Sequence, residues 1–197
     1  MEGSGPESAA AAPETPDAEL VRRAQKGDAP SFGTLYERYF DKVYSYLSFK
    51  LGSPTDAEDV AEQVFLKALE SLGSYKWTGV PFQAWLFRIA HNMMVDTLRR
   101  RSRRPSDPIE YAAGLSDERR SADPDAMLSD KLTREGLLEA VECLTELQKQ
   151  VISLKFAGGL PNAEVARLMG KSEGAVKALQ HAALASLQRH LRRSDAA

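Results

Sequence analysis

The segment Pro81–Arg104 (PFQAWLFRIAHNMMVDTLRRRSRR) constrains the fold of this chain more than any other. Apolar side chains recur along it at three- and four-residue steps, which places them on one face of a helix. Other apolar residues lie off that face, so we expect the helix to pack between neighbours with only one polar stripe free. The stripe carries Trp85, Arg88, Asn92, Asp96 and Arg99, and the segment ends in a cluster of arginines.

This stripe and its basic end have two interpretations. Arginines at a helix C-terminus complement the helix dipole, and a polar stripe is commonly just a solvated face. The same guanidinium groups also form a patch that suits nucleic-acid phosphates. The segment alone does not decide between these interpretations.

Helical periods and breaks divide the chain into two groups of helices. In the first group, helices are predicted from Asp17, as an N-cap, to about Gly27, from about Pro30 to Lys50, and from Asp56 to Leu72. Residues 102–129 are rich in proline, serine and charged side chains, as in a linker, and four further helices follow. We therefore expect an all-α protein with a disordered tail (residues 1–16) and two small helical domains (residues 17–101 and 130–193) joined by a flexible linker.

The second domain contains a helix-turn-helix pattern. The short helix NAEVARLM ends at Gly170, and a long helix capped by Ser172 runs to about Arg192. In such a pair the second helix presents side chains near its start to base edges in the major groove. Helical hairpins of this spacing also occur in proteins that never touch DNA, so the pattern favours DNA binding without establishing it.

The helix over residues 56–72 is amphipathic and is followed by an aromatic loop. Acidic residues in its first turn complement the dipole, but this does not account for Glu62 and Gln63 one turn further on. In the loop, Tyr75 and Trp77 are either core anchors, which we favour, or stacking platforms for unpaired bases. The expected outward face comprises Asp56, Asp59, Glu62, Gln63 and Glu70, and the expected buried stripe comprises Ala57, Val60, Ala61, Val64, Phe65, Ala68, Leu69 and Leu72.

Composition argues against several classes of function. Cys143 is the single cysteine, so it cannot form an internal disulfide, and its apolar neighbours predict a small core residue. No histidine pair has metal-ligand spacing, and we expect no metal, no cofactor and no catalytic centre. The N-terminus lacks a signal-peptide pattern and no apolar run could span a membrane, which predicts a cytoplasmic protein without membrane insertion.

Three motifs, in their order and spacing, resemble those of bacterial RNA polymerase sigma factors of the extracytoplasmic function (ECF) group. They are DAEDVAEQVFLKALE, PFQAWLFRIAHNMMVDTLRRRSRR and LTELQKQVISLKFAGGLPNAEVARLMGKSEGAVKALQHAALASL. The resemblance implies a promoter-specificity subunit that binds core RNA polymerase, recognises the −35 and −10 elements of promoter DNA and helps to melt the duplex. It also allows for an anti-sigma factor as a partner.

The resemblance implies roles for individual residues. Docking on core polymerase is expected at Asp56, Asp59, Glu62, Gln63 and Phe65. Contacts to −10 DNA are expected at Tyr75, Lys76, Trp77, Trp85, Arg88, Asn92, Arg99, Arg100 and Arg103. Contacts to −35 DNA are expected at Lys171, Ser172, Lys177, Ala178, His181 and Ala182.

Two departures from the family pattern bear on these roles. The family commonly has Gln-Glu where this chain has Glu62-Gln63, so the hydrogen bonds of the docking surface can differ. Two of the expected −35 contacts are alanines, which predicts sparse hydrogen-bond readout with apolar contact to thymine methyl groups instead.

One competing function is a conventional helix-turn-helix transcription regulator, which would bind duplex DNA without polymerase. In that case residues 17–101 would form a sensor or dimer domain. An enzyme is the weakest alternative, because neither the three histidines nor Cys143 has the spacing of a catalytic motif.

Overall fold

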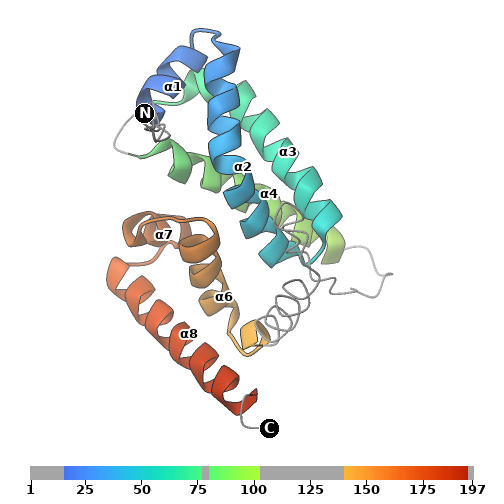
Figure 1. Ribbon diagram of the computed structural model, residues 1–197, viewed down its shortest axis with the longest axis vertical. Helices are drawn as coiled ribbons and strands as arrows, with labels where there is room; N and C mark the ends of the chain where they lie inside the picture. Colours follow the sequence, from blue (N-terminus) through green and yellow to red (C-terminus); the bar gives the residue numbers. More distant parts are fainter. Residues whose placement is uncertain (1–15, 77–79, 103–139, 195–197) are drawn as a thin grey trace, which may run out of the picture.

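The computed structural model describes residues 16–76, 80–102 and 140–194 (Figure 1). All regular structure within these ranges is helical, which confirms the all-α prediction. Nearly all of the predicted tail and of the predicted linker, and most of the first predicted helix of the second domain, lie outside the described residues. Trp77 and Arg103, two of the expected −10 contacts, also lie outside them.

The first group of helices is α1 (Asp17–Ala24), α2 (Ala29–Leu51), α3 (Pro54–Ser71) and α4 (Phe82–Ser102), with a 3₁₀ turn, η1 (Leu72–Ser74), after α3. Gly52 ends α2 with a φ of 67°, a value that favours glycine. Ser53 then caps α3 by accepting a hydrogen bond from the Asp56 backbone N–H, and Pro54 fits the first helical turn. The break predicted at residues 52–55 is therefore a left-handed stop followed directly by an N-cap.

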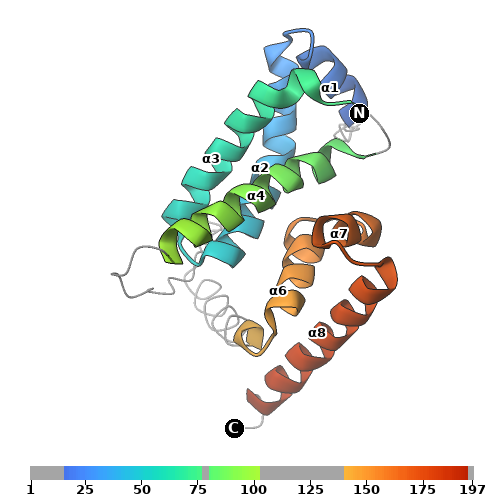
Figure 2. The same cartoon turned by 180° about the vertical axis from the view of Figure 1, so that it is seen from behind.

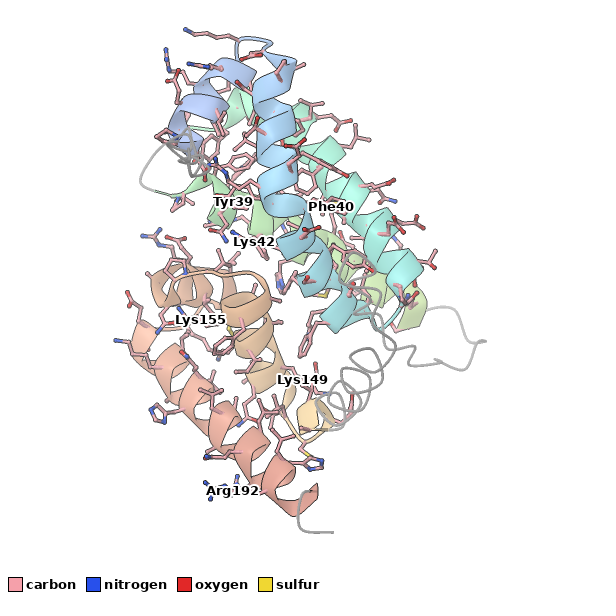
Figure 3. All side chains as sticks on the ribbon, viewed as in Figure 1. Tyr39, Phe40, Lys42, Lys149, Lys155 and Arg192 are labelled. Carbon is pink, nitrogen blue, oxygen red and sulfur yellow. The ribbon has the colours of Figure 1, made fainter. Side chains whose placement is uncertain are left out.

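Asp17 does not cap α1 as expected. Pro16 occupies the N-cap position, and the Asp17 side chain turns instead toward α2. Its carboxylate accepts a hydrogen bond from Tyr39 Oη and lies 2.5 Å from Arg38 Nη1. Lys42 Nζ stands 5.2 Å from the centroid of the same tyrosine ring (Figure 3). These contacts fix the start of α1 against α2.

The core of the first group lies where α2 meets α1, α3 and α4 (Figures 1 and 2). Apolar residues at helical spacing point inward from each helix, as their period predicts. Its largest fully buried side chains are Leu35, Val43, Tyr46, Leu47, Val64, Phe82, Leu86 and Phe87.

The second group consists of α6 (Glu146–Ile152), a π-helical turn η2 (Ser153–Ala157), α7 (Asn162–Met169) and α8 (Glu173–Ser194). Thr145 starts α6 with a capping box, in which Thr145 and Gln148 bond each other's backbone N–H. Gly170, with a φ of 61°, ends α7, and Ser172 Oγ then accepts from the Ala175 N–H at the start of α8. The helix-turn-helix geometry predicted for α7 and α8 is present.

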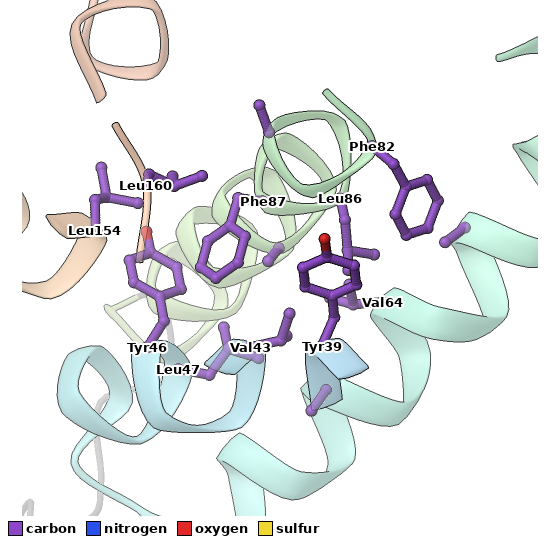
Figure 4. Packing of buried hydrophobic residues seen from close by; sticks show 14 of the residues in the cluster. Tyr39, Val43, Tyr46, Leu47, Val64, Phe82, Leu86, Phe87, Leu154 and Leu160 are labelled. Atoms are coloured by element: carbon purple, nitrogen blue, oxygen red, sulfur yellow. The ribbon is translucent and has the colours of Figure 1, made fainter. Parts of the chain in front are cut away.

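The two groups of helices share one hydrophobic core. Leu154 and Leu160, from the segment around η2, are buried in the same cluster as Tyr46 of α2 and Phe87 of α4 (Figure 4). Gln83 Nε2 donates to the Gly158 carbonyl across this contact at 2.6 Å, and Lys50 Nζ lies 3.4 Å from Glu146 Oε2. The second group therefore meets the first mainly through η2 against α2, and it touches α4 at Gln83 and Phe87.

Gly158 permits this close approach. A Cβ added there would lie 2.7 Å from the Leu154 carbonyl oxygen and 2.7 Å from Cε1 of the Phe87 ring. Real Cβ atoms do not tolerate such distances, so backbone or ring must shift. Glycine is required here by the space available and not by its φ of −76°.

A second buried contact near the shared core joins Tyr46 Oη to His91 Nδ1 at 2.9 Å. Burial, followed by the positive charge of Lys50, lowers the pKa of His91. Burial also raises the pKa of Tyr46, so its hydroxyl stays protonated and can donate to the imidazole. The folded protein thus prefers His91 neutral.

We predict that Gly158→Ala destabilises the protein by about 1–3 kcal/mol, because the added methyl group overpacks a rigid contact. Gly33→Ala is the matched control, since nothing lies within 4 Å of its added Cβ inside α2. That control should raise stability by about 0.5–1 kcal/mol. Urea unfolding of the full chain measures both, and equal free energies of unfolding for the two variants would contradict the tight contact.

We also predict that stability falls as the pH drops below about 6.5, the ordinary pKa of histidine. The folded-state pKa of His91 is lowered, so the unfolded chain binds its proton first, and stability present above that pH is lost as the pH falls. His91→Gln should flatten the slope of unfolding free energy against pH between pH 7 and 5. His181→Gln, at an exposed position on α8, is the matched control, and His91→Gln should change the slope more than this control does. A His91→Gln variant as steep as the wild type would refute this.

Candidate nucleic-acid and protein interfaces

Most of the polar stripe of α4 forms an exposed row of polar and charged side chains. Arg88, Asn92, Asp96, Arg99 and Arg100 are exposed, and none of the three arginine side chains forms an ion pair with the described residues. Between positions 85 and 99 the stripe extends about 21 Å along the helix. Unpaired cations in a row at this scale suit a phosphate backbone.

Trp85 lies at the N-terminal end of the stripe and is half-buried. Its ring packs against the rings of Tyr75 (centroids 5.0 Å apart) and Phe82 (5.6 Å). Three aromatic rings therefore meet where the loop before α4 joins the helix. An indole held this way is rigid, which suits a stacking surface for a base.

Arg101 differs from the other arginines of the cluster. It forms an ion pair with the carboxylate of Asp56, and its Nη1 donates to the Leu51 carbonyl at 2.9 Å. These bonds tie the end of α4 to the turn between α2 and α3. Asp56, expected among the docking residues, is engaged in this ion pair, while its side chain stays 41% exposed.

The outer face of α3 presents acids together with exposed leucines. Asp59, Glu62 and Gln63 are exposed, as predicted, and Leu66 and Leu69 are 58% and 50% exposed. The prediction that Leu69 is buried is wrong. Ala68 and Leu72 occupy the buried face, and Leu69, turned by 100° from Ala68, falls beyond its edge. Leu66 was not among the residues expected on the outer face of α3, although its position outside the buried period indicates that it is exposed.

Phe65, expected among the docking residues, is 3% exposed. Its ring packs beneath the surface against Tyr36 (4.7 Å between centroids) and Phe40 (6.0 Å). Phe65 therefore presents almost no surface to a partner in this structure, and its role in docking stays a prediction. Its ring instead supports the outer face of α3 from below.

Tyr75 is 7% exposed and is a core anchor, the alternative that the sequence favoured. Its hydroxyl donates to the Val80 carbonyl at 2.7 Å. Burial, with a smaller effect of the Asp17 carboxylate, raises the pKa of Tyr75 to about 12, so the hydroxyl remains a donor. No face of this ring is open to a base, in contrast to the expectation of a direct DNA contact. The neighbouring Lys76 is exposed.

The start of α8 carries the expected −35 residues. Lys177, Ala178, His181 and Ala182 are exposed, Lys171 is half-buried, and Ser172 caps the helix. Both views place α8 on the side of the second group that faces away from α1–α4 (Figures 1 and 2). Val176 and Ala183 point inward and hold α8 to its own domain.

Cys143 is not the core residue that the sequence predicted. It is exposed, and its Sγ lies 3.0 Å from His190 Nδ1. Within the described ranges, no group of three histidine, cysteine, aspartate or glutamate side chains is arranged to hold a metal ion. No helix found there is long and apolar enough to cross a membrane.

Comparison with known proteins identifies the class of protein. The family model Sigma-70 region 2 matches residues 35–104, and Sigma-70, region 4 matches residues 134–187. These segments contain the α4 stripe and the helix-turn-helix, respectively. Together they define a sigma factor.

Individual relatives narrow the class. The ECF RNA polymerase sigma factor BldN of Streptomyces coelicolor is 39% identical over 173 residues, which cover 88% of this chain and 65% of BldN. The ECF RNA polymerase sigma-E factor of Escherichia coli strain K12 is 34% identical over 168 residues, covering 82% of this chain and 86% of that protein. The chain therefore belongs to the ECF group of the sigma-70 family.

A solved structure shows the same arrangement of helices. It is that of CnrH in complex with the cytosolic domain of CnrY, with a TM-score of 0.66 and 25% sequence identity. The match covers 90% of this chain and 97% of CnrH.

Proposed function

We propose that this protein is a promoter-specificity subunit, which directs core RNA polymerase to its start sites and helps to open the DNA. It acts by binding, not by catalysis, in the cytoplasm, where the polymerase works. The observation that carries the proposal is the α4 stripe, in which Arg88, Arg99 and Arg100 lie exposed and unpaired by the described residues beside a rigidly held Trp85. A conventional regulator that reads only duplex DNA has no need of an aromatic ring at such a place.

We assign the docking of polymerase to the outer face of α3. Asp59, Glu62 and Gln63 surround two exposed leucines, Leu66 and Leu69. Exposed apolar side chains with a polar rim are typical of a protein interface. A basic partner helix would pair with the acids while the leucines supply apolar contact. Phe65 packs beneath this face, and the ion pair of Asp56 with Arg101 lies at its N-terminal end.

We assign −10 recognition to α4 and the loop before it. Arg88, Arg99 and Arg100 would neutralise phosphates, Asn92 offers both a donor and an acceptor to a base edge, and Trp85 offers a ring. Extruding a base from a duplex costs a few kcal/mol, and stacking on an aromatic ring returns about 1–3 kcal/mol per base. Lys76, Trp77 and Arg103 belong to this assignment as predictions from the sequence.

We assign −35 recognition to the start of α8. Lys177 and His181 can reach base edges or phosphates, while Ala178 and Ala182 can contact thymine methyl groups. Lys171 and Ser172, at the helix N-terminus, suit a phosphate. Because CnrH was solved with a partner protein, we extend to this chain the proposal that an anti-sigma factor binds it.

The direct test is run-off transcription with purified core polymerase on a library of genomic fragments. We predict RNA that starts at defined sites only when this protein is added. Substitution of bases in the −10 and −35 elements of those promoters should reduce the yield. Specific duplex binding by the free protein, with no initiation in the presence of core polymerase, would favour the conventional regulator instead.

A second prediction concerns docking. Asp59→Lys with Glu62→Lys should weaken binding to core polymerase at least tenfold, because the charge of the outer face of α3 is reversed at its rim. The control is Glu37→Lys with Asp41→Lys, which makes the same change of charge at exposed positions on α2. Pull-down and fluorescence titration with core polymerase measure both pairs. Equal weakening by both would indicate a long-range effect of charge and contradict a local docking face.

A further inference from the structure

After α3 the chain turns through η1, and the side chain of Gln25, at the end of α1, forms hydrogen bonds with this turn. The 3₁₀ turn η1 is closed by a hydrogen bond from the Tyr75 backbone N–H to the Leu72 carbonyl at 3.0 Å. Gln25, at the C-terminus of α1, adds two hydrogen bonds here: its Nε2 donates to the Leu72 carbonyl at 2.9 Å and to the Tyr75 carbonyl at 2.8 Å. One primary amide thus bridges the two ends of η1 and fixes where the chain points at residue 75.

The hydroxyl of Tyr75 makes the next bond in this series. It donates to the Val80 carbonyl at 2.7 Å, so the side chain of Tyr75 holds the backbone at residues 75 and 80 together. The same ring packs on Trp85 (5.0 Å) and edge-on against Phe82 (6.1 Å). The position of Trp85 therefore depends on Tyr75, and the position of Tyr75 depends on the bond from Gln25.

The other end of α1 is fixed independently. Asp17 is held by Tyr39 and Arg38 of α2, while Leu20 and Val21 are buried in the core. Helix α1 is therefore a short strut that connects α2 to the start of the segment leading into α4. The Sigma-70 region 2 match begins at residue 35, so this strut lies outside it.

We infer that Gln25 and Tyr75 are positioning residues for promoter opening, which hold Trp85 in the orientation that receives a base. This inference rests on the proposed function of α4. Neither residue need touch DNA. Their role is to spare Trp85 the loss of conformational freedom when a base stacks on it, since a preorganised ring binds better than a mobile one.

Three variants, each of which changes one functional group, provide the test. Tyr75→Phe removes the hydroxyl but keeps the ring, Gln25→Ala removes both donors, and Gln25→Glu keeps the shape but replaces the donor with an acceptor. Tyr46→Phe is the matched control, since it also removes a hydroxyl bonded in the interior of the same group of helices. Each variant is assembled with core polymerase, and the rate of open-complex formation is measured on a duplex promoter and on one with a pre-melted −10 element.

We expect Tyr75→Phe, which loses one hydrogen bond, to open the duplex promoter about 3- to 10-fold more slowly, and the Gln25 variants, which lose two, to be slowed at least as much. On the pre-melted promoter they should stay within about twofold of wild type, because base extrusion is already done. Affinity for core polymerase should not change. Tyr46→Phe should show no difference between the two templates.

Equal slowing on both templates, or no slowing by Gln25→Ala and Tyr75→Phe, would overturn the inference. Because Gln25 is exposed, its variants keep the test decisive even if Tyr75→Phe reduces stability. If wild-type protein opens no promoter with core polymerase, the proposed function fails together with the inference. If the wild type opens the promoter normally and the variants slow opening equally on both templates, only the inference is refuted.

Discussion

Helix α4 is packed against α2 and α3 and also touches the second group at Gln83 and Phe87, and this packing determines which of its side chains remain for ligands. Phe82 packs against Tyr39 of α2 (5.8 Å between ring centroids), while Phe87 packs against Tyr46 of α2 (5.6 Å) and lies close to Gly158, directly after the π-helical turn. What is left between these surfaces is the line of Trp85, Arg88, Asn92 and Arg99. The polar stripe is narrow because both of its edges are fixed by packing.

The arginines at the end of α4 illustrate how one cluster divides between two tasks. Arg101 lies on the inner side and joins Asp56 to the Leu51 carbonyl, so it stabilises the turn between α2 and α3. Arg100 and Arg99, one and two positions earlier, are rotated into solvent. A run of like residues therefore contains both a structural bond and a candidate phosphate site, and only the phase of the helix separates them.

Within the described residues, the sequence predicted the helices, their breaks and the helix-turn-helix, because each depends on local period and on residues such as Gly52, Gly170 and Ser172. Side chains near the edge of a buried face were harder to predict. Leu69 and Phe65 both belong to the apolar period, yet one is exposed and the other is buried, because the neighbouring helix α2 covers only part of the arc. The Gln25 bonds and the shared core between the two groups join residues far apart in sequence, and no local pattern reports such pairs.

The shared core has a consequence for any rearrangement of the chain. A second group that moves away from the first must expose Tyr46, Phe87, Leu154 and Leu160 to water, and hydration of such apolar surface is unfavourable. A fragment that contains only one of the two groups of helices would expose its part of this apolar surface to water permanently. Properties measured on either half in isolation would then include self-association that the intact polypeptide does not show.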